Sequence, residues 1–187
     1  MSKIVPWRIW FNFVRMLLLC FAVLGLGTVY AQEIASYKRD VAERSRQHLK
    51  ALPQESRDQQ LPDRLHGAVK EYREILKQGA QAEKFTDAQS KALEDRSSRN
   101  LTALRNAFNS KDVRADSKFS KQTEECNQMC GTPQTKCLEQ NVTHGSFGAY
   151  RCHIEAFSCL LTCTMPEYSS YAIAPSVPAA PSGLTVK

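Results

Sequence analysis

The sequence predicts an all-α protein, built as helical hairpins in a slender bundle with a disulfide-stapled antiparallel α-hairpin near its C-terminus. Apolar residues recur at helical spacing between residues 32 and 125, and no segment there has the alternation of a strand. Six of the seven cysteines lie between Cys126 and Cys163, in two groups whose spacings mirror each other. The first observation indicates helices, and the second indicates two helices that lie antiparallel and are cross-linked.

Residues 1–31 have the pattern of a secretory signal peptide. Basic residues precede an uncharged apolar run from Met16 to Val29, and the small side chains of Val29 and Ala31 fit the positions that a signal peptidase reads. The run is shorter than the ~20 residues of a spanning helix. We therefore expect cleavage after Ala31 and a mature chain without a membrane span. The exported protein would lie in the periplasm of a Gram-negative host or otherwise be secreted; an uncleaved anchor is the alternative.

The charge of the mature chain argues against nucleic-acid binding. The leader carries three of the 25 basic residues and none of the 19 acidic ones, so its removal lowers the formal charge from +6 to +3. A protein that grips nucleic acid concentrates its excess charge on one face. Here acidic and basic residues alternate along the chain, which is typical of solvated helix surfaces.

The first helix of the mature chain is expected over residues 33–52. It ends before Pro53, because the residue ahead of a proline disfavours helical geometry. Residues 53–62 then form a polar link between two prolines.

Two further helices follow the link. Asp63 is a suitable N-cap for a helix that continues to Gly79. Thr86 with Gln89 three residues later has the signature of a capping box, and the apolar stripe of that helix ends at Phe108.

These helices form a charged, thinly apolar region over residues 32–115. Only sixteen of the 94 residues from 32 to 125 are Leu, Ile, Val or Phe, which is below the usual share for a chain that supports its own core. Two interpretations stay open: a bundle of marginal stability, or helices that await a partner. At the other end, residues 165–187 are rich in Pro, Ala and Ser and are expected to form a disordered tail.

The cysteines of residues 116–164 predict a stapled hairpin. The gaps between them are three, six, fourteen, six and three residues, and this symmetry is that of two antiparallel arms. Six cysteines allow fifteen pairings, among which the sequence alone does not choose. The symmetry favours the nested set, namely Cys126–Cys163, Cys130–Cys159 and Cys137–Cys152. At about 100° per residue, the three cysteines of each arm share one face of a helix.

One segment argues against a continuous first arm. Gly131, Thr132 and Pro133 lie between two of its cysteines and are expected to interrupt the helix. Thr132 as N-cap and Pro133 at the first helical position would restart it. Such a break would affect the innermost bridge, Cys137–Cys152, more than the other two.

The spacing of Cys126 with Cys130, and of Cys159 with Cys163, resembles the twin CX3C helical hairpins of small mitochondrial intermembrane-space proteins, chaperones among them. The likeness covers about a fifth of the chain. It implies that Cys126 pairs with Cys163 and Cys130 with Cys159. The chain departs from that pattern in its longer central interval, its additional cysteine pair and its secretory leader, and we carry over no function.

Structural disulfides are the preferred role of the six cysteines, because an exported chain meets an oxidising compartment. A thiol–disulfide enzyme usually has Cys-x-x-Cys near a βαβ pattern, and neither is present in the sequence. A zinc site would have to draw on a Cys/His cluster made of His144, Cys152, His153 and Cys163. Adjacent Cys152 and His153 point in different directions from a helix, so we expect neither a metal nor a cofactor.

The second arm carries an apolar stripe opposite its cysteines, formed by Tyr150, Ile154, Phe157 and Leu161. A soluble protein rarely leaves such a stripe exposed. Either the N-terminal helices cover it, or it is a partner-binding surface for another protein or a second copy of the chain. The residues of this stripe are the candidate binding residues.

No residue has a recognisable catalytic role. The four histidines (His48, His66, His144 and His153) lie in no catalytic motif, and no phosphate-binding loop or nucleophile elbow is present in the sequence. We therefore expect a secreted or periplasmic protein that is not an enzyme. It would act by binding, as an adaptor, inhibitor, holding chaperone or component of an envelope assembly. The alternative is a small envelope enzyme, or a metal-binding or thiol-redox protein that uses the Cys/His cluster.

Overall fold

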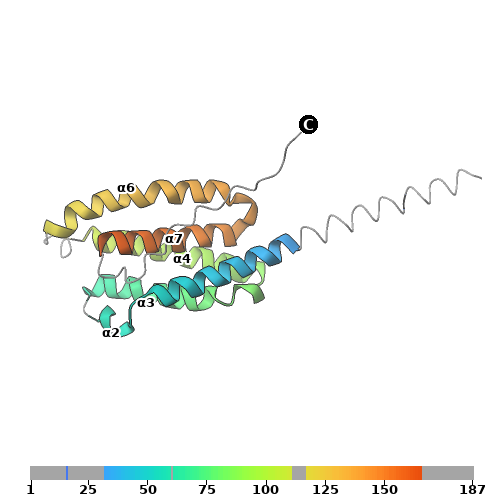
Figure 1. The fold of residues 1–187 in the computed structure, drawn as a ribbon, viewed down its shortest axis with the longest axis horizontal. Coiled ribbons are helices and arrows are strands. Elements are labelled where there is room, and N and C mark those ends of the chain that lie inside the picture. The colour runs from blue at the N-terminus through green and yellow to red at the C-terminus, as the bar shows by residue number, and fades with distance from the viewer. Residues whose placement is uncertain (1–15, 17–31, 60, 111–116, 166–187) are drawn as a thin grey trace, which may run out of the picture.

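The structure, a computed structural model, describes residue 16 and residues 32–59, 61–110 and 117–165 (Figure 1). The expected signal peptide and the expected tail lie outside these residues, apart from Met16 and Met165. Within the described part every regular element is helical, which confirms the all-α class. None of the described helices combines the length and the apolar character that a bilayer crossing needs.

The described chain begins with a helix over residues 32–51, here called the N-terminal helix. It is followed by α2 (Glu55–Asp58), α3 (Asp63–Gly79), the short 3₁₀ turn η1 (Ala82–Lys84), α4 (Asp87–Phe108), α6 (Ser117–Gln140), the 3₁₀ turn η2 (Val142–His144) and α7 (Gly145–Thr164). The three long helices predicted before the cysteines correspond to the N-terminal helix, α3 and α4.

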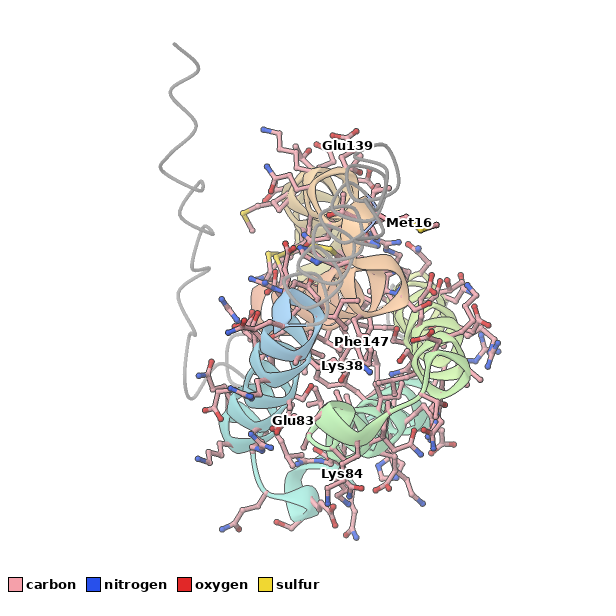
Figure 2. The ribbon with its side chains drawn as sticks, turned by 90° about the vertical axis from the view of Figure 1, so that its right-hand side faces the viewer. Met16, Lys38, Glu83, Lys84, Glu139 and Phe147 are labelled. Carbon is pink, nitrogen blue, oxygen red and sulfur yellow. A yellow bond between two sulfur atoms is a disulfide. The ribbon has the colours of Figure 1, made fainter. Side chains whose placement is uncertain are left out.

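Helix α7 is the central element. It packs along α6 on one side and along α4 on the other, and α3 in turn packs on α4. Figure 1 shows α6 lying over α7, with the remaining helices on the opposite side. The end-on view in Figure 2 shows the same arrangement, with Glu139 at the outer edge of α6. The hairpin is therefore an α6 layer placed on a bundle that includes α7.

Local sequence signals set the helix ends. The capping box of α4 is confirmed: the Thr86 hydroxyl accepts from the backbone N–H of Gln89 at 3.3 Å, and the Gln89 side chain accepts from the backbone N–H of Thr86 at 2.8 Å. In α3 the N-cap is Pro62, and Asp63 is the first helical residue. At this position the Asp63 carboxylate interacts favourably with the positive end of the helix dipole.

The polar link between the first two long helices contains a short helix that the sequence did not predict. In α2, Asp58 forms an ion pair with Arg73 of α3, with 2.6 Å between its Oδ2 and the arginine Nε. Both side chains are buried, at 4% and 7% exposure. Arg73 also donates to the backbone carbonyl of Pro53. A buried guanidinium thus fixes the start and the middle of the link.

The expected break in the first arm of the hairpin is wrong, because α6 runs through Pro133 without interruption. Proline inside a helix removes one N–H donor and costs about 3 kcal/mol. The carbonyl that loses this donor belongs to Met129, a residue that is 59% exposed. Bridges at Cys130 and Cys137 hold the helix on both sides of the proline.

One hydrophobic cluster joins the N-terminal region to the hairpin. The twelve largest fully buried side chains all lie in α3, α4 and α7. They are Leu65, Tyr72, Ile75, Leu76, Leu101, Leu104, Phe108, Tyr150, Ile154, Phe157, Leu160 and Leu161. Helices α3 and α4 have few apolar residues, and α7 supplies the others that the core needs.

Candidate functional site

Three nested disulfides join α6 to α7, as the symmetry of the cysteines predicts. They are Cys126–Cys163, Cys130–Cys159 and Cys137–Cys152, with Cα–Cα distances of 5.8, 5.9 and 5.6 Å. Such distances are normal for disulfides. Because these bonds persist in oxidising compartments, they are compatible with an exported protein.

Each bridge joins one buried cysteine to one that is half-buried. Cys126, Cys130 and Cys152 are at most 1% exposed. Their respective partners Cys163, Cys159 and Cys137 are half-buried. Every bridge therefore has one side near the solvent.

Helix α6 contributes little else to the interior. Among residues 122–140, whose side chains the structure describes, only Thr123, Cys126 and Cys130 are buried. Hydrogen bonds also join α6 to its neighbours: the Gln122 amide donates to the backbone carbonyl of Cys163 at 3.0 Å, and Arg105 of α4 donates to Gln134 at 2.5 Å. The attachment of this part of α6 is thus mainly covalent.

The solvent side of α6, called here the outer face, comprises ten exposed residues: Glu124, Glu125, Gln128, Met129, Thr132, Pro133, Thr135, Lys136, Glu139 and Gln140. Met129 is 59% exposed and is the large apolar residue of this face. Three carboxylates and one lysine give the face a net negative charge, on a chain whose total charge is positive.

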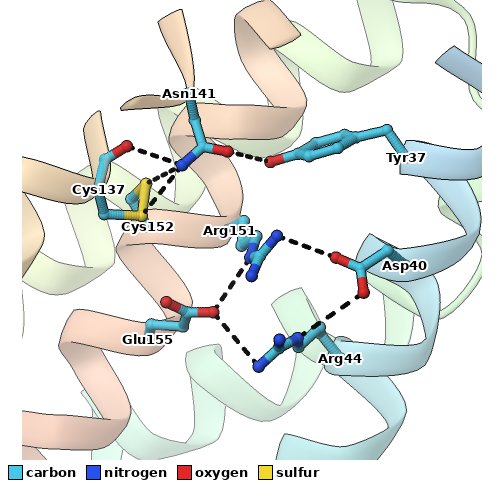
Figure 3. The surroundings of a disulfide bond; sticks show 8 residues. All are labelled: Tyr37, Asp40, Arg44, Cys137, Asn141, Arg151, Cys152 and Glu155. Atoms are coloured by element: carbon cyan, nitrogen blue, oxygen red, sulfur yellow. Dashed lines mark hydrogen bonds and ion pairs between the residues drawn. A yellow bond between two sulfur atoms is a disulfide. The ribbon is translucent and has the colours of Figure 1, made fainter. Parts of the chain in front are cut away.

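Asn141, just after α6, links the innermost bridge to the N-terminal helix (Figure 3). Its amide nitrogen donates to the carbonyl of Cys137 at 2.8 Å, and its amide oxygen accepts from the Tyr37 hydroxyl at 2.9 Å. The Tyr37 ring stacks on His144 with 3.9 Å between ring centroids. Burial is the main cause that raises the pKa of Tyr37, so its hydroxyl keeps its proton at neutral pH.

A group of four charges joins α7 to the N-terminal helix beside that bridge (Figure 3). Arg151 lies 3.0 Å from Asp40 and 3.2 Å from Glu155. Arg44 lies 3.7 Å from Glu155 and 3.9 Å from Asp40. Opposite charges alternate around this group, so it orients the two helices.

The apolar stripe of α7 lies in the core. Tyr150, Ile154, Phe157 and Leu161 are each at most 1% exposed. Tyr72 of α3 stacks on Phe157 with 3.9 Å between ring centroids, and Ser45 hydrogen-bonds the Tyr150 hydroxyl at 3.0 Å. The structure thus shows that the N-terminal helices cover the apolar stripe. We therefore do not propose these residues as a contact surface.

The histidines are distributed over separate places. His48 is 6% exposed, and burial followed by the nearby charge of Arg44 lowers its pKa to about 4. His153 is 8% exposed, and its Nδ1 lies 3.1 Å from the Ser97 hydroxyl. Within the described ranges, no three His, Cys, Asp or Glu side chains are grouped to hold a metal ion.

A hollow of about 330 Å³ lies where the N-terminal helix meets the start of α7. It is lined by residues that include Ile34, Tyr37, Lys38, His144 and Phe147. The Lys38 ammonium lies 5.3 Å from the centre of the Phe147 ring, and it donates to the carbonyl of Phe85 at 2.7 Å. Figure 2 shows Lys38 and Phe147 close together at this end of the bundle. The ammonium group of Lys38 is thus already partnered.

Similarity to known proteins assigns no function to this chain. No family model matches the chain, and no curated protein or solved structure has significant similarity to it.

Proposed function

We propose that this protein is exported to an oxidising compartment and acts there by binding a protein partner, without catalysing a reaction. Its leader is removed after Ala31, and the mature chain lies in the periplasm of a Gram-negative host or is secreted. The contact surface is the outer face of α6. The protein serves as an adaptor, inhibitor, holding chaperone or component of an envelope assembly.

The observation that carries this proposal is the contrast between how firmly α6 is held and how little of it is buried. Three disulfides fix this helix, yet among the residues whose side chains the structure describes, the twelve largest fully buried ones all lie in other helices. Core stability therefore does not account for three cross-links. A helix fixed in advance loses less conformational entropy on binding, so rigid attachment favours a role as a contact surface.

The charge of the outer face indicates the kind of partner. Glu124, Glu125 and Glu139 outnumber Lys136, and Met129 supplies an exposed apolar side chain. A partner with basic groups around an apolar pocket is complementary to this arrangement. Complementary charges raise the rate of association and fix the register of the complex.

Site-specific photo-crosslinking in the native compartment tests the proposal. A photoreactive residue at Met129 or Lys136 should give a discrete protein adduct. The matched control is Lys91 on α4, where the side chain is 58% exposed, and it should give none. An adduct of twice the chain mass would identify a second copy as the partner. Equal labelling at Lys91 and at both α6 positions, or no adduct at any of them, would contradict the proposal.

The purified protein also discriminates between this proposal and the alternative of a metal-binding or thiol-redox protein. The proposal requires six cysteines that are inaccessible to alkylation without a reductant, and no bound metal. Reactive thiols in the native protein, or one metal ion per chain, would favour the alternative.

A further inference from the structure

Over residues 122–140, the part of α6 whose side chains the structure describes, few side chains are buried. This part of the helix buries one threonine and two cysteines, and hydrogen bonds of Gln122 and Gln134 join it to other helices. An ordinary amphipathic helix is held by an apolar stripe of three or four residues per two turns. Here the face toward α7 carries cysteines in place of that stripe.

Most of the hydrophobic core lies in the bundle beneath α6. Tyr72 of α3, Phe108 of α4 and Phe157 of α7 are among the fully buried side chains that these three helices supply. The Tyr72 hydroxyl also donates to the carbonyl of Ile154 at 2.9 Å. None of these contacts passes through a disulfide, so cutting the bridges leaves them in place.

The sequence of α6 does not favour a helix by itself. Gly131 and Pro133 lie in its interior, and these are the two residue types least suited to a helix interior. Isolated helices are marginal in water even when every residue is favourable. Once separated from α7, this segment should therefore lose its helical structure.

Each bridge is open to thiol–disulfide exchange from one side. The half-buried cysteines are Cys137, Cys159 and Cys163. A thiolate of a dithiol reductant attacks the sulfur of such a cysteine, and the sulfur of its buried partner leaves as a thiolate. The second thiol of the reductant then attacks this mixed disulfide and releases the first cysteine as a thiolate. The reductant becomes a disulfide. Each bridge takes up two electrons and two protons and becomes two thiols.

We propose that α6 is an oxidation-gated layer: it is helical and seated on α7 while the bridges are intact, and it separates and unfolds when they are reduced. The N-terminal helix, α3, α4 and α7 keep their fold in both states. The consequence for binding rests on the function proposed above. If the outer face of α6 is the contact surface, the chain is inactive in a reducing compartment and becomes active after export.

Amide hydrogen exchange on the mature chain tests the gate without any partner. One sample is left oxidised, and the other is reduced with dithiothreitol and alkylated with iodoacetamide. Amides of residues 122–140 should exchange on the order of 100-fold faster or more after reduction, whereas those of α3 and α4 should change by no more than about threefold. Unchanged protection in α6 would overturn the proposal, and so would the collapse of protection in all helices together.

A variant separates the loss of the bridges from the effect of alkylation. Replacing the three α6 cysteines by alanine (C126A, C130A and C137A) removes every bridge and leaves the α7 cysteines in place. This variant should show the exchange pattern of the reduced chain under non-reducing conditions. Protection of α6 in this variant would show that non-covalent contacts suffice, and the gate would be refuted.

Crosslinking from Met129 distinguishes failure of the gate from failure of the binding function. If both proposals are correct, the oxidised chain forms the adduct and the reduced chain does not. Exchange that responds to reduction, with no adduct in either state, supports the gate and refutes the contact surface. An adduct that persists after reduction refutes the gate.

Discussion

The hydroxyl of Tyr72 donates a 2.9 Å hydrogen bond to the carbonyl of Ile154, while the Tyr72 ring stacks on Phe157. One side chain of α3 thus contacts the second arm of the hairpin through both its polar and its apolar part. This contact belongs to the core that α7 shares with the N-terminal region, in which Tyr72 is 2% exposed.

Two substitutions of Tyr72 should separate these contributions. Tyr72→Phe keeps the ring and removes the hydroxyl, so the free energy of unfolding should fall by about 1 kcal/mol. Tyr72→Ala removes the stacked ring as well and should cost about 3–5 kcal/mol. Urea unfolding followed by circular dichroism measures both. Similar losses in the two variants would show that the stack contributes nothing.

Gly79, the last residue of α3, should not accept a side chain. A Cβ there would lie 2.0 Å from the Tyr150 hydroxyl oxygen and 2.5 Å from the Ser45 hydroxyl oxygen. Both groups are buried and hydrogen-bonded to each other, so neither can move without cost. Gly79→Ala should lower the free energy of unfolding by more than about 2 kcal/mol, because overpacking a core costs this much.

Gly67 is the matched control for Gly79. It lies in the interior of the same helix, and a Cβ there would meet no atom within 4 Å. Because alanine favours a helix interior over glycine, Gly67→Ala should stabilise the fold by about 0.5–1 kcal/mol. Thermal unfolding of the two variants should therefore shift in opposite directions. A shift of the same sign would contradict the packing around Gly79.

The stapled hairpin and the capping box of α4 could be predicted because each rests on a local or symmetric pattern. Six cysteines with mirrored spacing restrict the pairings, and Thr86 with Gln89 is a signal within one turn. The pairing of Asp58 with Arg73 could not be predicted, because it joins residues fifteen positions apart and depends on how a short link folds. The sequence marks the outer face of α6 only by polar residues opposite the cysteines, such as Glu124 and Gln128, and this pattern is that of any solvated helix surface.

The continuity of α6 through Pro133 shows how a long-range constraint overrides local propensity. Propensity alone predicts a break at Pro133. The chain also contains Cys130 and Cys137, whose bridges fix both sides of the proline on a continuous α7. The innermost bridge closes a loop of 15 residues, which contributes about 3 kcal/mol in the chain-entropy model. This is comparable to the cost of the proline.

Pro133→Ala should therefore stabilise the oxidised protein. Alanine supplies the N–H that the Met129 carbonyl lacks and removes the clash of the ring, while the unfolded chain gains up to about 1 kcal/mol of conformational entropy. We expect a net gain of about 1–2 kcal/mol in the free energy of unfolding. Hydrogen exchange should show the largest increase in protection between residues 129 and 137. A loss of stability would mean that the proline is needed for the geometry of the bridges.

Acid should destabilise the fold well before most carboxylates are protonated. Burial, followed by the charge of Arg44, lowers the pKa of His48 from its ordinary 6.5 to about 4, and burial also lowers the pKa of His153. Both histidines then bind protons more readily when the chain is unfolded. The contribution of each is complete above pH 6.5 and declines as the pH falls below 6.5, and that of His48 is lost between pH 6.5 and about 4. For His48 this loss reaches about 3 kcal/mol once the pH falls below 4.

His48→Gln provides the control, because glutamine is polar and does not titrate. We would measure the free energy of unfolding in urea from pH 7.5 to pH 4.5 for both proteins. At pH 7.5 the variant should be no more stable than the unsubstituted protein. Between pH 7.5 and pH 4.5 its free energy of unfolding should fall by about 2–3 kcal/mol less than that of the unsubstituted protein. If the two curves run parallel, His48 is protonated as readily in the folded chain as in the unfolded one. The imidazole would then be accessible to water, and the seating of the N-terminal helix on the bundle would differ from that described.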